Sequence, residues 1–364
     1  MTLLDDPGHL EAADEAGLLR AVASGAAQVR EAGQLSADAG VGELAGEDRP
    51  RSVVVCGAGT SALVGDLVAA VAGPACPVPV LSHRGYGLPV WVGAADLVVA
   101  VSFSGTTAQT LWALEEAVRR GCRVLVVCAA GSPAEALGRR GRSPVVPVPQ
   151  VRPAKASLWA VATPVLLAAG ALGLLQRDGA GGLVEAAAAA LEAVADRCRV
   201  DADQVVNPAK TLAASLEGTL PVVWGTSALA GVAARRLAGL LQETARRPAL
   251  WGELPDVQGQ LAVFDAAVSR DLFHDPFEDG PVTAAAPEPH LVLLRDAPED
   301  PRAARLADDL QERVRERGAG VSALQAQGAA PVERLASLVG LAEYTAVYAA
   351  LASGVDPAAA ASVR

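Results

Sequence analysis

A short cluster of hydroxyl residues and glycine carries the clearest chemical signal in the chain. Ser102, Ser104, Gly105, Thr106 and Thr107 follow directly on the apolar run 97–101. Residues 108–119 have the pattern of a helix, so the cluster lies where a strand ends and a helix begins. Hydroxyl groups and the N–H groups of a helix N-terminus can together hold a phosphate without any lysine. The same side chains can instead cap the helix, and the sequence leaves both interpretations open.

Composition and charge restrict the kind of partner. Of the 364 residues, 51% are hydrophobic and 20% are charged, which provides enough apolar material for the cores of two domains. The formal net charge is −11 and no long basic run occurs, which argues against nucleic acid and against an anionic membrane as partners. An anionic substrate must therefore be held by local dipoles.

Three further features point to an ordinary intracellular globular protein. The five cysteines are scattered without a CxxC motif or a Cys/His cluster, which predicts reduced thiols and no metal. The acidic N-terminus lacks the basic and apolar pattern of a signal peptide, so we expect a cytoplasmic location. Residues 158–175 carry no charge, but they are rich in Ala and Gly and include Pro164, so we predict a buried core helix rather than a membrane span.

The first half of the chain alternates apolar runs with helix-length segments. Because these runs are apolar on both faces, they predict a parallel sheet covered by helices on both sides, with a ligand at the carboxyl ends of its strands. The predicted strands are Ser52–Cys56, Val78–Leu81, Leu97–Val101, Val124–Cys128 and Val145–Val148.

The second half repeats part of this pattern. After a hinge-like segment at 176–182 and a helix at 183–197, residues 221–231 (PVVWGTSALAG) echo residues 53–65 (VVVCGAGTSALVG). A strand at 291–294 is followed by Arg-Asp-Ala-Pro instead of hydroxyls, so only the first copy is equipped for phosphate. We predict an N-terminal helical segment at 1–50, a first domain at 51–178 and a second domain at 179–364.

These motifs resemble the sugar isomerase (SIS) domain superfamily, and within it the bifunctional phosphoglucose/phosphomannose isomerases. GAGTSALVGDL at 57–67 is similar to the family's GMGGSAIGGDL, and SFSGTTAQTL at 102–111 is similar to SYSGNTEETL. An R, Y, LP, WV segment at 84–92 lies between them. NPAK at 207–210, LLQETARRPALWGELPD at 240–256 and EYTAVYAALASGVDP at 343–357 follow in the family's order.

The resemblance implies an α/β fold of two tandem SIS domains, each a five-stranded parallel sheet flanked by helices, assembled as a homodimer without a cofactor. In it, Gly59, Thr60 and Ser61 approach the sugar. The phosphate is held by Ser102, Ser104 and Thr107.

The implied reaction interconverts an aldose 6-phosphate and fructose 6-phosphate, with a base that moves a proton between C2 and C1 and an enediolate between the two. Glu243 of QETAR falls at the position of the family's base. Its neighbours Leu240, Leu241 and Ala245 are apolar, so we expect a partly buried carboxylate with a raised pKa.

Other catalytic positions depart from the family pattern. Sixteen residues after Glu243, the family's ring-opening histidine is matched by Gly259, with Gln258 and Gln260 beside it. The phosphate-proximal arginine is matched by Ala154, with Lys155 as the possible replacement. The chain has no lysine after Lys210, and Arg364 is too uncertain a match for the family's C-terminal lysine.

Two histidines, His83 and His274, are candidates to replace the missing acid, although a surface or capping role is the simpler interpretation of each. Three hypotheses follow. The chain is an isomerase that recruits a different acid, or a catalytically weakened phosphosugar-binding protein with a regulatory role, or an oligomerisation scaffold in which the hydroxyl loop merely caps a helix.

Overall fold

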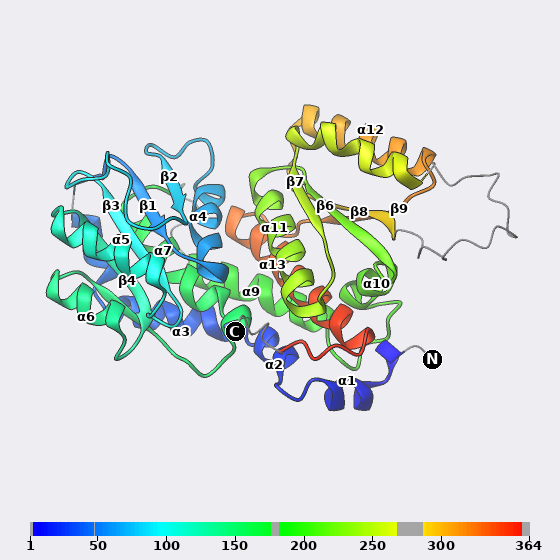
Figure 1. Ribbon diagram of the computed structural model, residues 1–364, viewed down its shortest axis with the longest axis horizontal. Coiled ribbons are helices and arrows are strands. Elements are labelled where there is room, and N and C mark those ends of the chain that lie inside the picture. Colours follow the sequence, from blue (N-terminus) through cyan, green and yellow to red (C-terminus); the bar gives the residue numbers. More distant parts are fainter. Residues whose placement is uncertain (1–2, 47, 176–181, 268–286, 359–364) are drawn as a thin grey trace, which may run out of the picture. The chain divides into compact units, whose positions relative to one another are not determined.

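Two parallel sheets organise the chain, each in its own unit (Figure 1). The computed structural model describes residues 3–46, 48–175, 182–267 and 287–358. The first-sheet unit comprises Gly17–Asp196 and Gln327–Gly340, and the second-sheet unit comprises Met1–Ala16, Arg197–Ala326 and Leu341–Arg364.

The first sheet has five parallel strands in the order β2-β1-β3-β4-β5. Alternate residues of β1 and β3, such as Cys56 and Ala100, pack in one core with α5, whereas Val55 faces α4 on the other side. Both faces are thus buried, which explains why these strands are apolar throughout. The strands are β1 (Val53–Cys56), β2 (Val80–His83), β3 (Leu97–Ser102), β4 (Arg123–Ala129) and β5 (Val145–Val148). The helices are α2 (Leu18–Ala23), α3 (Gly25–Asp38), α4 (Val64–Ala72), α5 (Ala108–Arg119), α6 (Pro133–Arg140), α7 (Leu158–Ala171) and α9 (Leu183–Arg197), with the short 3-10 helices η2 (Val41–Gly46), η3 (Gly59–Leu63) and η4 (Ala154–Ala156).

The five predicted strands of this sheet are confirmed, with boundaries that agree to within two residues; the largest difference is at β2. Strand β2 begins at Val80 rather than Val78. Pro77 and Pro79 flank Val78, and a proline has no N–H to donate to a neighbouring strand. The prediction that the charge-free segment starting at Leu158 is a buried helix is also confirmed, because most residues of α7 are buried.

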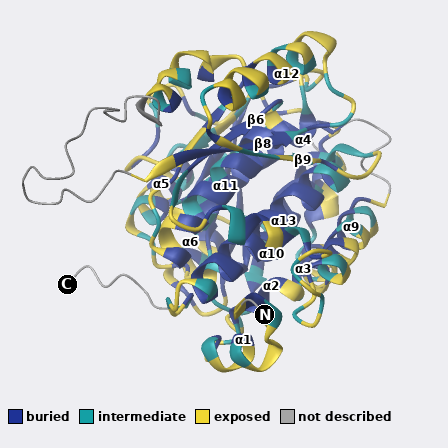
Figure 2. Ribbon diagram, turned by 90° about the vertical axis from the view of Figure 1, so that its right-hand side faces the viewer, coloured by how far each residue is buried: buried dark blue, intermediate teal, exposed yellow. Residues whose placement is uncertain are grey.

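The second sheet has four parallel strands among the described residues, in the order β7-β6-β8-β9, and not the expected five. Figure 2 shows β6, β8 and α11 largely in the colour of buried residues. The strands are β6 (Thr219–Gly225), β7 (Leu250–Glu253), β8 (Glu288–Arg295) and β9 (Gly320–Gln325). The other elements are η1 (Leu3–Asp5), α1 (Pro7–Ala13), α10 (Pro208–Ser215), α11 (Ala228–Ala245), η5 (Asp256–Ala267), α12 (Pro301–Glu316) and α13 (Pro331–Ala352), the last of which is divided between the units.

The two sheets share a strand order, which supports the predicted duplication. In each sheet the first strand along the chain lies between the second and the third, and the fourth lies beyond the third. Equivalent glycines stand at the end of the first strand of each sheet, Gly57 directly after β1 and Gly225 as the last residue of β6. A Cβ on Gly57 would lie 2.7 Å from the carbonyl oxygen of Ser61, and a Cβ on Gly225 would lie 2.3 Å from the carbonyl carbon of Ala230. Only glycine lets each strand run so closely into its helix.

The compact units are divided differently from the predicted domains. Residues 17–50 form α2, α3 and η2 and pack with the first sheet, and most of α9 also belongs to that unit. The reason is packing across long sequence separations: α3 contacts α7 extensively, and Leu191 of α9 contacts Gly25. The hinge-like segment lies at 176–182, and its residues 176–181 are outside the described residues.

Among the described residues, α13 is long and apolar enough to cross a membrane, with a mean hydropathy of 1.5. However, 94% of the apolar segment of α13 is buried inside the structure, which is typical of a core helix. The cysteines are all free, as predicted, and Cys56, Cys128 and Cys198 are buried. Burial raises the pKa of Cys56 to about 12, so its thiol stays protonated and inert.

Candidate functional site

The hydroxyl cluster forms a closed turn at the carboxyl end of β3. Ser102 is the last residue of the strand and is 2% exposed. Its Oγ lies 3.0 Å from Oγ1 of Thr107 and accepts a hydrogen bond from the N–H of Gly105 at 3.0 Å. Ser104 is exposed, and its Oγ lies 2.9 Å from Oγ1 of Thr106. We call residues 102–107 the hydroxyl loop.

Gly105 is required by the shape of this loop. Its φ is +68°, and a Cβ built on it would lie 2.1 Å from Oγ of Ser132. Ser132 is the N-cap of α6, and the N–H of Ala134 in that helix donates to the carbonyl of Gly105 at 3.1 Å. Gln150 holds the loop from the other side, because its Nε2 donates to the carbonyl of Phe103 at 2.8 Å. The loop is therefore fixed before any ligand arrives.

The helix-capping interpretation of the hydroxyls is wrong for α5. Thr107 is its N-cap residue, but no side chain caps the helix, since the Thr107 hydroxyl is engaged with Ser102. Thr110, in the first turn, is buried, and its Oγ1 has no hydrogen-bond partner among the described residues. The first N–H groups of α5 thus remain uncapped, with the positive end of the helix dipole at the loop. Such an arrangement suits a phosphate.

The glycine turn after β1 lies at the same edge as the hydroxyl loop. Strands β1 and β3 are neighbours, with Cys56 opposite Ala100. Gly59 is exposed with a φ of +56°, whereas Ser61 is 4% exposed within η3. Gly59, Thr60 and Ser61 therefore begin one strand away from the hydroxyl loop, as the sequence predicts. Lys155 lies in η4 of the same unit, beyond β5, and is partly exposed.

Glu243 does not have the environment expected of it. It lies in the last turn of α11, in the second-sheet unit, and its side chain is exposed. The apolar neighbours Leu240, Leu241 and Ala245 are buried, but they occupy other faces of the helix. The expectation of a partly buried carboxylate is therefore wrong, because apolar sequence neighbours do not bury a residue on the opposite side of the same helix turn.

The equivalent edge of the second sheet is filled by the protein's own side chains. Ser227 caps α11 through the N–H of Ala230 and donates to Asp296 at 2.8 Å. Thr226 donates to Glu299 at 2.7 Å. The two acids and the internal pairing disfavour a phosphate at this edge.

Gly259, Gln258 and Gln260, at the position that the resemblance gives to the family's histidine, carry no acidic side chain. Gly259 is exposed, and a Cβ built on it would meet nothing within 4 Å. Gln260 accepts a hydrogen bond from Nε1 of Trp224 at 3.2 Å, and Gln258 is exposed. These glutamines therefore serve packing and surface roles in the second-sheet unit.

The described histidines occupy three different settings. His9 is partly exposed in α1, and His290 is buried at the start of β8 with Nε2 2.9 Å from Oγ of Ser322. His83 ends β2, at the same sheet edge as the hydroxyl loop, and its Nε2 lies 2.7 Å from the carbonyl oxygen of Gly87. His274 and Arg364 lie outside the described residues.

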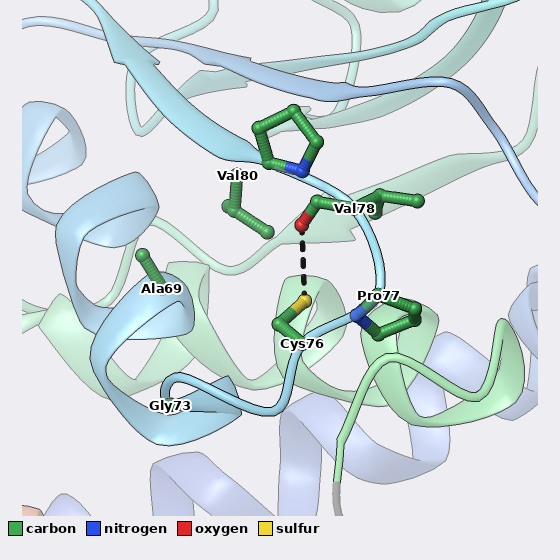
Figure 3. Close-up of a pocket in the computed structure, with 7 residues that line it drawn as sticks. Ala69, Gly73, Cys76, Pro77, Val78 and Val80 are labelled. Carbon is green, nitrogen blue, oxygen red and sulfur yellow. Dashed lines mark hydrogen bonds between the residues drawn. The ribbon is translucent and has the colours of Figure 1, made fainter.

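Two hollows in the first-sheet unit differ from this site. One, of about 320 Å³, lies at the start of β2 and is apolar, with Sγ of Cys76 donating to the carbonyl of Val78 at 3.2 Å (Figure 3). The other, of about 720 Å³, lies at the amino-terminal edge of the sheet and is lined by Arg49, Arg51 and Arg123. Asp96 pairs with Arg51 beside it. The first offers no donors for phosphate, and the second is a competing place for an anion.

A parallel α/β unit with a glycine turn and an uncapped hydroxyl loop at its carboxyl edge is typical of α/β proteins that bind phosphate. Comparison with known proteins makes the class more specific. Residues 205–364 match the family described as the bacterial phospho-glucose isomerase C-terminal SIS domain. This part of the chain is therefore similar to a SIS domain of the phosphosugar isomerases.

Relatives along most of the chain support this assignment. The bifunctional phosphoglucose/phosphomannose isomerase of Caldicellulosiruptor bescii is 27% identical over 305 residues, covering 84% of this chain and 85% of the relative. That of Aquifex aeolicus is 24% identical over 310 residues, with coverages of 84% and 86%.

Solved structures share the fold. A hypothetical protein from Thermus thermophilus has a TM-score of 0.69 at 16% identity, covering 96% of this chain and 91% of that chain. The C-terminal domain of glucosamine-fructose-6-phosphate aminotransferase from Francisella tularensis has a TM-score of 0.66 at 15% identity, with coverages of 94% and 98%.

Proposed function

We propose that the protein is an aldose–ketose isomerase that converts glucose 6-phosphate or mannose 6-phosphate to fructose 6-phosphate. The observation that carries the proposal is the hydroxyl loop of the first-sheet unit. In this loop, two pairs of hydroxyl groups lie next to the uncapped N-terminus of α5. In this proposal Ser102, Ser104 and Thr107 surround the phosphate.

The glycine turn then receives the sugar. Gly59 brings its backbone to the ligand without a side chain in the way, while Thr60 and Ser61 supply hydroxyls. Lys155 adds a positive charge from the segment after β5, in place of the arginine that the family carries. With a net charge of −11, the chain gains specificity for the anionic end of the substrate from these local groups.

Glu243 is the proposed base. It removes the proton from C2 of the open-chain aldose and returns it to C1, through an enediolate whose charge needs hydrogen-bond donors close by. A homodimer and a cytoplasmic location belong to the same proposal. Both rest on the family resemblance and on the composition of the chain.

A second function has its own supporting observation. Glu243 is exposed, and neither Gly259 nor the glutamines on either side of it can act as an acid at the position that the resemblance gives to the family's histidine. Loss of a general acid typically lowers a rate by about 10²–10⁴-fold, while binding through the hydroxyl loop is unaffected. The alternative is therefore a weakened SIS protein that binds a phosphosugar in a regulatory role.

One experiment separates the two functions. The protein is incubated with glucose 6-phosphate or mannose 6-phosphate, and formation of fructose 6-phosphate is followed together with thermal stabilisation by each ester. Turnover that Glu243→Gln abolishes supports the isomerase. Stabilisation without turnover, lost in Ser104→Ala, supports the regulatory protein.

The arginine-lined hollow provides the matched control. Arg49→Ala removes a positive charge at the opposite edge of the same sheet and leaves the hydroxyl loop intact. We expect this variant to retain the stabilisation that Ser104→Ala loses. The reverse result would place the anion at the arginines and contradict both functions.

A further inference from the structure

His83 is the described histidine at the ligand edge of the first sheet. It is the last residue of β2, paired in register with Cys56 at the end of β1. Cys56 is also opposite Ala100 of β3, and both belong to the core on the α5 side of the sheet. Since aligned residues of parallel strands point to the same face, His83 and Ser102 share that face and that edge.

The spacing of His83 and the hydroxyl loop suits a phosphorylated hexose. His83 and Ser102 are separated by two strand spacings of about 4.8 Å across the sheet and by two residues, about 6.6 Å, along the strand. Their Cα atoms therefore lie about 12 Å apart. The glycine turn of η3 follows β1, the strand between them. A sugar on that turn, with its phosphate in the hydroxyl loop, extends toward His83.

The ring of His83 is held in a fixed orientation. Its Nε2 lies 2.7 Å from the carbonyl oxygen of Gly87 and, facing an acceptor, carries a hydrogen. The segment that bears this carbonyl is itself anchored to α5. The N–H of Leu88 donates to Glu116 at 2.8 Å, and Arg120 donates to the carbonyls of Leu88 and Pro89 at 3.1 and 2.7 Å. Nδ1 is therefore the nitrogen that exchanges a proton.

Charged groups around His83 are engaged with one another. On the α4 side, Asp66 pairs with Arg84 and accepts from Ser82. On the α5 side, Glu116 pairs with Arg120 at 2.6 Å. An imidazole can act as a general acid through one ring nitrogen while the other ring nitrogen keeps a hydrogen bond, whereas these carboxylates and guanidinium groups are paired with each other.

We propose that His83 is the acid that opens the sugar ring, in place of the family's histidine that Gly259 replaces. This inference rests on the proposed isomerase function. The imidazolium of His83 gives its Nδ1 proton to the ring oxygen O5 as the C1–O5 bond breaks and its electron pair passes to O5. The electrons of the O1–H bond form the C1=O double bond, and that proton leaves to water. Water then reprotonates Nδ1.

Ring opening and isomerisation can be measured separately. An acid that opens the ring also accelerates the interconversion of the α and β anomers of glucose 6-phosphate, which is followed by NMR exchange. His83→Gln is expected to lower both anomerisation and isomerisation by about 10²-fold or more, while thermal stabilisation by glucose 6-phosphate remains. Glu243→Gln is expected to abolish isomerisation and retain anomerisation. His9→Gln, a change in α1 of the second-sheet unit, is expected to match the wild type.

The outcomes decide between the two proposals. If the wild type isomerises the sugar and the anomerisation and isomerisation rates of His83→Gln stay within about threefold of the wild-type rates, the proposed role of His83 is refuted while the isomerase function stands. If wild type neither anomerises nor isomerises the sugar, both fail. If His83→Gln folds poorly, His83→Ala is assayed with added imidazole. Recovery of anomerisation supports the inference, and absence of recovery overturns it.

Discussion

Replacing Gly105 with alanine tests whether the hydroxyl loop depends on contact with α6. The φ of +68° costs an alanine about 1 kcal/mol relative to glycine. The added Cβ would also lie 2.1 Å from Oγ and 2.3 Å from Cβ of Ser132, so the N-cap of α6 must move. Overpacking and a lost cap add about 1–3 kcal/mol. We expect Gly105→Ala to lower the free energy of unfolding by about 2–4 kcal/mol and to abolish stabilisation by a sugar phosphate.

The matched control is Gly121→Ala at the other end of α5. Gly121 also has a φ of +68°, but a Cβ there would meet nothing within 4 Å. Gly121→Ala should lower the free energy of unfolding only by the backbone strain at this φ, about 1 kcal/mol, and stabilisation by a sugar phosphate should be unchanged. Both variants are measured by urea unfolding with linear extrapolation.

A double variant isolates the clash. Ser132→Gly removes both clashing atoms, leaves Cβ of Cys128 at 3.5 Å as the next contact, and weakens the cap by only a few tenths of a kcal/mol. Gly105→Ala combined with Ser132→Gly should therefore be more stable than Gly105→Ala alone. Equal losses in Gly105→Ala and Gly121→Ala, or no recovery in the double variant, would refute the reasoning.

Three further predictions concern buried polar groups of the second-sheet unit. Arg236→Met should lower the free energy of unfolding by about 3–5 kcal/mol, because it removes the partner that lies 2.6 Å from the buried Glu343, whose pKa is already raised by burial. Urea unfolding of the double variant with Glu343→Leu should show that most of this loss is recovered. Nζ of Lys210 donates hydrogen bonds to two backbone carbonyls at 2.7 and 2.8 Å, so Lys210→Met should lower the free energy of unfolding by about 1–3 kcal/mol for each carbonyl. An unchanged midpoint of urea unfolding would contradict this. Burial lowers the pKa of His290 below 6.5, so the unfolded chain takes up that proton first and stability falls as the pH drops below about 6.5; His290→Gln should lose this part of the pH dependence, measured as the difference in unfolding free energy between pH 7 and pH 5.

Local sequence pattern is enough to predict the first sheet and the place of the hydroxyl loop. Strands buried on both faces must be apolar throughout, so the runs at 97–101 and 124–128 identified β3 and β4 without further information. The serine and threonine cluster after β3 needed no tertiary contact to be placed at a helix N-terminus, because local spacing decides where a strand gives way to a helix.

Short or half-exposed elements could not be predicted in this way. Strand β7 has four residues with Leu250 and Trp251 exposed, and β9 is largely exposed, so neither shows a buried apolar run. The supporting contacts of the hydroxyl loop also escaped notice. The N-cap signature of Ser132 followed by Pro133 is visible in the sequence, but nothing local shows that it touches Gly105 across 27 residues.

Long-range packing decides whether a candidate residue faces solvent or the core, and which group its hydroxyl or carboxylate contacts. Leu240, Leu241 and Ala245 are buried while Glu243 is exposed, because successive residues of a helix point about 100° apart. Thr107 bonds Ser102 instead of capping α5, which only the closed turn makes possible. His83 shares an edge and a face with Ser102 because the register of three strands brings together residues 19 apart in sequence. The spacing of apolar residues in the sequence determines where helices and strands form, whereas long-range packing determines which groups each side chain contacts.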